Sequence, residues 1–99
     1  MKMNNFKVGQ VVRSTAGRDK GQFMIVCDIL DQNYVAICDG KQRKISNPKK
    51  KKVKHLAKTN HIVTILHEKI INGDKINNAE IRNYLRKYDN TEAGISEEV

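Results

Sequence analysis

The residues of this chain whose types could do chemistry are mainly lysines and arginines, and they gather in one segment. Residues 41–58 hold nine Lys/Arg and no acidic residue. Residues 1–60 hold fourteen Lys/Arg against four Asp/Glu, whereas residues 61–99 hold five against seven. Spread-out positive charge would indicate only solubility, but nothing acidic nearby in the sequence relieves the repulsion within this segment. A concentrated stripe therefore favours a polyanionic partner, because binding releases counterions.

The densest part of that segment, NPKKKKVKHL at residues 47–56, is open to three interpretations. It has the look of a nuclear import signal, but it would also suit a solvated loop, or a strand that leaves a small barrel beside a phosphate backbone. Import signals occupy accessible segments, whereas Val53 and Leu56 are apolar and should pack. Pro48 should end the preceding strand, because proline has no backbone donor. We therefore expect the lysines to line a phosphate-facing edge of the fold.

The remaining reactive residues do not indicate catalysis or metal binding. His55, His61 and His67 have no nucleophile at a plausible spacing, and the acids are scattered. Ten residues separate Cys27 from Cys38, whereas a zinc site usually draws its ligands from close pairs such as C-x-x-C. Both cysteines lie in apolar runs, which predicts free, buried thiols. We expect a protein that is not an enzyme and that uses no metal, cofactor or small-molecule substrate.

The elements that must position the basic segment are short strands in the first half of the chain. Apolar runs with β-branched residues alternate there with polar and glycine-containing turns. Asp39 and Gly40 between two extended runs predict a hairpin, because both residues tolerate positive φ. A sheet of this size protects its edges by curling into a barrel. We expect strands at residues 6–15, 22–30, 34–38, 41–46 and 51–56.

The second half of the chain changes to a helical period. Residues 61–71 suit one face of a helix, although two β-branched residues keep a strand possible at the start. Asn77 and Glu80 have the spacing of a capping box, and Ile76 and Ile81 have that of a hydrophobic staple. A helix should therefore run from residue 78 to about residue 88. The predicted division is a basic barrel at 1–58, a helical extension at 59–88 and an acidic, flexible tail at 89–99.

The segment VGQVVRSTAGRDKGQFMIV, residues 8–26, resembles a KOW motif. Gly21 matches the defining glycine of that motif and Gly17 a small position, whereas Ser14 is more polar than usual. With CDGKQRKISNPKKKKVKHL and GDKINNAEIRNYL in the same order, residues 6–88 resemble KOW-domain RNA-binding proteins of low-GC bacteria. Those proteins are similar to the large-subunit ribosomal protein L-fourteen-e of archaea and eukaryotes. The resemblance implies a mainly β fold, a five-stranded SH3-like barrel of KOW type with a C-terminal α-helical appendage.

The resemblance also implies binding to structured RNA, with ribosomal RNA as the expected partner and Gly17 and Gly21 in structural roles. Lysine outnumbers arginine fourteen to five, which favours contacts with phosphates over reading of base edges. Phe23 and Tyr34 could stack on bases, but their apolar surroundings favour a place in the barrel wall. The residues expected to contact RNA are Arg13, Arg18, Lys20, Lys41, Arg43, Lys44, Lys49, Lys50, Lys51, Lys52, Lys54, His55 and Lys58.

The expected function is that of a non-catalytic RNA-binding protein that acts in or on the ribosome, as a component, an assembly factor or a translation-associated factor. The C-terminal helix would cover one end of the barrel or contact a ribosomal protein. No run is long and apolar enough for a bilayer, and the first residues are not an apolar signal, so we expect a cytoplasmic protein without a membrane partner. The alternative is a protein-interaction module, because SH3-like barrels also bind proteins.

Overall fold

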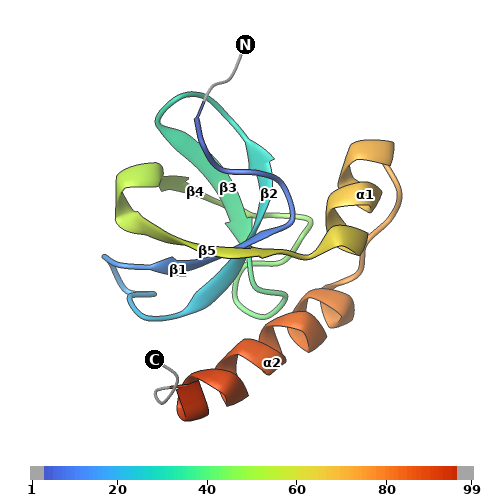
Figure 1. The fold of residues 1–99 in the computed structure, drawn as a ribbon. Helices are drawn as coiled ribbons and strands as arrows, with labels where there is room; N and C mark the ends of the chain where they lie inside the picture. The colour runs from blue at the N-terminus through green and yellow to red at the C-terminus, as the bar shows by residue number, and fades with distance from the viewer. Residues whose placement is uncertain (1–3, 96–99) are drawn as a thin grey trace.

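The computed structural model of the protein describes residues 4–95, and side chains through residue 88. Five strands form one antiparallel sheet in the order β4-β3-β2-β1-β5, and two helices follow (Figure 1). This confirms a mainly β fold of five strands with a helical C-terminal part. The elements are β1 (Gln10–Ser14), β2 (Phe23–Ile29), β3 (Tyr34–Cys38), β4 (Lys49–Lys52), the 3-10 helix η1 (Val53–His55), β5 (Leu56–Ile62), α1 (Thr64–Asn72) and α2 (Asn78–Ile95).

The barrel expected from the sequence is not closed by strand pairing. Among the described residues β4 pairs only with β3, and β5 pairs only with β1, so both remain edges of the curved sheet. The short η1 turns the chain from one edge to the other (Figure 1). Backbone hydrogen bonds tie the ends of this turn to neighbouring loops, from Val53 N to Asn33 O and from Thr15 N to His55 O. Side chains of β4 and of the β1–β2 loop bridge the rest of the gap.

Two of the predicted strands are wrong. Residues 41–46 form a loop, because Asp39 Oδ1 accepts hydrogen bonds from the backbone N–H groups of Lys41 and Arg43 at 2.8 and 2.9 Å. Those groups are consequently engaged in a local turn and cannot pair with β3. The lysine run at 49–52 pairs with β3 instead, and the last strand begins at Leu56 rather than at residue 51.

Both faces of the sheet are apolar, and each has its own core. The concave face encloses Val12, Met24, Val26, Val35, Ile37 and Leu56. The opposite face carries Val11, Ile25 and Cys38, which pack against Leu66 of α1 and against Ile81 and Leu85 of α2. Figure 1 shows α2 running along this side of the sheet and α1 beyond the end of β5. The apolar stripe of α2 is therefore engaged with the sheet.

The predicted helices are present with shifted ends. Residues 61–62 complete β5, so α1 begins at Thr64, later than the pattern predicted. The N-cap of α2 is confirmed, because Asn77 Oδ1 accepts a hydrogen bond from Glu80 N at 2.9 Å. The Glu80 carboxylate does not complete the capping box; it pairs with Lys69 of α1 at 3.0 Å. The helix is assigned through Ile95, past the expected end at residue 88, and residues 96–99 of the expected tail lie outside the described residues.

Candidate nucleic-acid interface

The four lysines of β4 are divided by the strand period into two pairs with opposite directions. Lys49 and Lys51 stand opposite Ile37 and Val35, whose side chains belong to the concave core. Lys50 and Lys52 stand opposite Ala36 and Tyr34, on the other face of the sheet. Because successive side chains of a strand point to opposite faces, one run of identical residues forms two different environments.

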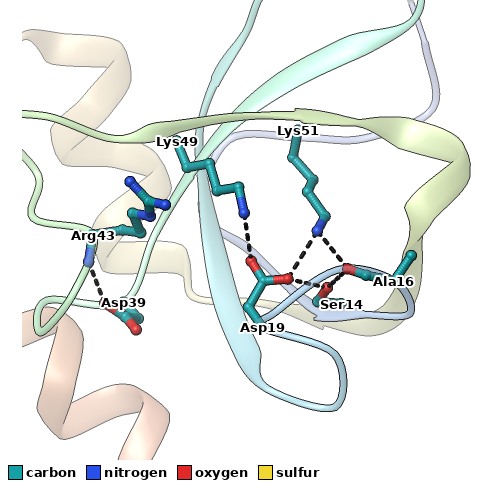
Figure 2. A network of polar contacts seen from close by, with 7 residues as sticks. All are labelled: Ser14, Ala16, Asp19, Asp39, Arg43, Lys49 and Lys51. Atoms are coloured by element: carbon teal, nitrogen blue, oxygen red, sulfur yellow. Dashed lines mark hydrogen bonds and ion pairs between the residues drawn. The ribbon is translucent and has the colours of Figure 1, made fainter.

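The inward pair meets a carboxylate on the β1–β2 loop (Figure 2). Lys51 Nζ donates to Asp19 Oδ1 and to the carbonyl oxygen of Ala16, both at 2.8 Å. Lys49 Nζ lies 3.3 Å from Asp19 Oδ2, and the Ser14 hydroxyl donates to Oδ1 at 2.6 Å. Asp19 and Lys51 are only 8% and 6% exposed, so this is a nearly buried, hydrogen-bonded ion network. It joins the free edge strand β4 to the far end of β1 and bridges the opening of the sheet.

The loop that presents Asp19 depends on Gly17 and Gly21. Both glycines have a φ of +90°, a region that residues with a Cβ atom seldom adopt. The Gly21 N–H closes the loop by donating to the Ser14 carbonyl at 2.7 Å. The two glycines that the sequence marked as structural therefore turn the chain so that the carboxylate between them points back toward β4.

The ionisation of Asp19 is strongly coupled to the fold. Burial alone would raise the pKa of this carboxyl group, but hydrogen bonds from Lys51, Ser14 and Lys49 and the charge of Lys51 outweigh burial. The net result is a pKa held well below the usual value near 4. Asp19 therefore stays ionised in the folded protein throughout the neutral and mildly acidic range.

We predict that the free energy of unfolding falls in acid because of this network. A carboxyl group whose pKa is lower when folded stabilises the protein above its unfolded pKa of about 3.9, and the contribution is lost as the pH falls toward the folded value. Urea unfolding measured from about pH 7 down to about pH 3 should show this loss. The decline should be shallower in Asp19→Asn, which has no carboxyl group to protonate; an equally steep decline in that variant would assign the effect to other acids.

The outward pair of lysines flanks the ring of Tyr34. Lys50 Nζ lies 4.5 Å and Lys52 Nζ 6.0 Å from the ring centroid, on the face opposite to the Asp19 network. Tyr34 is half-buried, with its ring beside two ammonium groups rather than inside a core. The aromatic ring and the two cations together form a positively charged patch, which we call the Tyr34 patch. Such a patch suits phosphates and stacked bases.

The other residues expected to contact RNA lie in loops around β4, in η1, and in the strands β1 and β5. Arg18 and Lys20 are exposed on either side of Asp19, in the loop that the network joins to β4. Lys54 is exposed and His55 half-buried in η1, directly after β4. The exposed side chains elsewhere are those of Arg13 in β1, of Lys41, Arg43 and Lys44 in the β3–β4 loop, and of Lys58 in β5.

Two statements made from the sequence need correction at this site. The repulsion in residues 41–58 is partly relieved, because Asp19, about thirty residues away in the chain, forms ion pairs with both Lys49 and Lys51. Lys51 is also almost completely buried, so it is not available to a ligand without loss of the network. Among the described residues no acidic side chain forms an ion pair with the other seven cations of that segment.

Sequence reasoning overlooked the ion network of Asp19 and the contact of the Tyr34 ring with the lysines of β4. Asp19 is the one acid within residues 1–27 and stands between two glycines, and that isolation was the available signal. The contact of Tyr34 with the lysines follows from its position opposite the lysine run, and that position is known only once the β3–β4 register is known.

The two cysteines lie apart from any cluster of described acidic side chains that could form a metal site. Among the side chains that the structure describes within residues 4–95, no group of three or more His, Cys, Asp or Glu could hold an ion. Both cysteines are free; Cys38 is buried and Cys27 half-buried. The same residues include no helix that is long and apolar enough to span a membrane.

The sequence of the chain is similar to that of a ribosomal protein. No family model matches the chain. Over 63 residues the chain is 32% identical to the large ribosomal subunit protein eL14 of Desulfurococcus amylolyticus. The chain is similar to eL14. The similarity covers 64% of this chain and 66% of that relative, just under two thirds of the relative's length, and it supports the ribosomal part of the resemblance drawn from the motifs.

Proposed function

We propose that the protein is a non-catalytic RNA-binding protein of the cytoplasmic ribosome that holds structured ribosomal RNA through its phosphates. The observation that carries this proposal is the Tyr34 patch, where two lysines stand side by side with no acid paired to them among the described residues. The similarity to eL14, a large ribosomal subunit protein, supports the ribosome as the place of action. We also infer an SH3-like topology of KOW type, in keeping with the strand order and with η1 between β4 and β5.

The proposed interface extends from the Tyr34 patch to the cations beside β4. Lys50 and Lys52 make the central contacts, with Lys54 and His55 following in η1. Lys49 and Lys51 hold β4 in place through their contacts with Asp19. They therefore affect RNA binding by positioning Lys50 and Lys52. The further members are Arg13, Arg18, Lys20, Lys41, Arg43, Lys44 and Lys58.

Replacing Lys50 and Lys52 with glutamine should weaken binding to ribosomal RNA about tenfold near physiological salt. Each phosphate contact releases counterions, so the slope of log K against log salt should also become shallower by about 1.5. Both quantities follow from electrophoretic shifts across a salt series. The fold should survive, because Lys50 is exposed, Lys52 is only half-buried and neither belongs to the Asp19 network.

The matched control is Lys7→Gln with Lys75→Gln, which removes the same charge from two exposed positions outside the interface. This control should change the affinity less than twofold. Equal losses in both double variants would show diffuse attraction and remove the site assignment. If the affinity of the wild-type protein for ribosomal RNA did not depend on salt, or if the protein did not sediment with ribosomal subunits, the RNA function would be overturned in favour of a protein partner.

A further inference from the structure

A second basic feature lies away from the Tyr34 patch, in a pocket between α2 and two loops of the sheet. The pocket has a volume of about 410 Å³, within the range of ordinary ligand sites. One wall is α2, with Arg82, Leu85 and Arg86. The remaining wall comes from the end of the β1–β2 loop and from the β3–β4 loop, through Gly21, Gln22, Phe23, Asp39, Lys41 and Gln42.

The described side chains that line this pocket are mainly basic, and the carboxylate of Asp39 among them already accepts hydrogen bonds. Among the described residues that line the pocket, Lys41, Arg82 and Arg86 face one carboxylate, that of Asp39, whose Oδ1 accepts two backbone hydrogen bonds within its own loop. Arg82 is held in place by the hydrogen bond from its Nη1 to the Gly40 carbonyl at 2.7 Å. A guanidinium group has five N–H donors, so this bond positions Arg82 and leaves donors for an anion.

The uncharged lining has the mixture of groups that a nucleobase requires. Leu85 is buried and Phe23 half-buried, and together they supply the apolar part of the pocket lining. The side-chain amides of Gln22 and Gln42 are exposed and have no hydrogen-bond partner among the described residues. An amide offers both donors and an acceptor, as the edge of a base does. A site for inorganic phosphate alone would use neither the apolar surface nor the amides.

We propose that this pocket receives one unpaired nucleotide of the bound RNA. Its base lies against Phe23 and Leu85 within reach of the two glutamine amides, and its phosphate meets Lys41 and Arg86. A base inside a duplex is stacked and cannot enter a pocket, whereas a bulged or looped base can. The inference rests on the proposed RNA function and adds to it a preference for RNA with an unpaired base, which phosphate contacts on the Tyr34 patch do not create.

The test compares two RNA hairpins that differ only by a single-nucleotide bulge in the stem. The wild-type protein should bind the bulged hairpin roughly tenfold more tightly, the effect expected from one stacked base. Gln22→Ala with Gln42→Ala removes no charge and should reduce that preference severalfold while binding to the paired hairpin is unchanged. Lys41→Gln with Arg86→Gln should nearly abolish the preference, whereas the control Lys7→Gln with Lys75→Gln should keep it.

The outcomes separate this inference from the function on which it rests. If the wild type binds both hairpins equally, the nucleotide pocket is refuted and the phosphate-binding function stands. If it binds neither hairpin nor ribosomal RNA, the proposed function falls and the pocket assignment falls with it. A preference for the bulge that survives both pocket variants would place the unpaired base elsewhere on the protein and also overturn the assignment.

Discussion

Replacing Asp19 with asparagine should lower the free energy of unfolding by about 3 kcal/mol, because it leaves the Lys51 ammonium buried without its counter-charge. Lys51 Nζ lies 2.8 Å from Asp19 Oδ1 and is otherwise bonded to the Ala16 carbonyl. The substitution also removes the tie between the edge strand β4 and the β1–β2 loop, so the sheet should open on that side. Urea denaturation at neutral pH measures the loss.

The control for this experiment is Asp28→Asn, which removes the same charge from an exposed position in β2. Asp28→Asn should change the free energy of unfolding by less than about 0.5 kcal/mol. Adding Lys51→Met to Asp19→Asn should recover much of the lost stability, because the unpaired buried charge is then gone. If Asp19→Asn cost no more than the control, the network would be incidental to the fold.

Replacing Gly40 with alanine should also destabilise the protein by about 3 kcal/mol, through steric conflict and backbone strain together. Gly40 has a φ of +78°, and a Cβ atom built there would lie 2.5 Å from the Asn78 carbonyl oxygen and 2.9 Å from Arg82 Cγ. The loop and the first turns of α2 would have to separate. Such separation would also break the hydrogen bond from Arg82 to the Gly40 carbonyl.

Gly73 provides the matched comparison, because its φ of +76° is nearly the same and nothing lies within 4 Å of its Cβ position. Gly73→Ala should therefore cost only the backbone term, about 1 kcal/mol. Thermal or urea unfolding of the two variants separates steric conflict from strain. Equal losses in both would mean that α2 is not held close to the β3–β4 loop.

Local rules succeeded at the start of α2, where the interacting residues are neighbours in the chain. The cap of α2 could be read from the sequence because Asn77 and Glu80 are three residues apart and a helix brings those positions together. Local rules failed at residues 41–46, where the pattern indicated a strand. There the Asp39 side chain binds the backbone of its own loop, a competing local bond that takes the place of strand pairing.

The sequence alone determined the mainly β first half, the helical second half and the concentration of positive charge in residues 41–58, since these depend on residue type and short-range period. Only the tertiary structure decided what each lysine of β4 does. Pairing with β3 sends Lys50 and Lys52 to Tyr34, while Lys49 and Lys51 turn toward a carboxylate 30 and 32 residues earlier in the chain. The four lysines carry the same charge, because charge is a property of the side chain. They differ in burial and in partners, because these are set by the strand register and by contacts between distant segments.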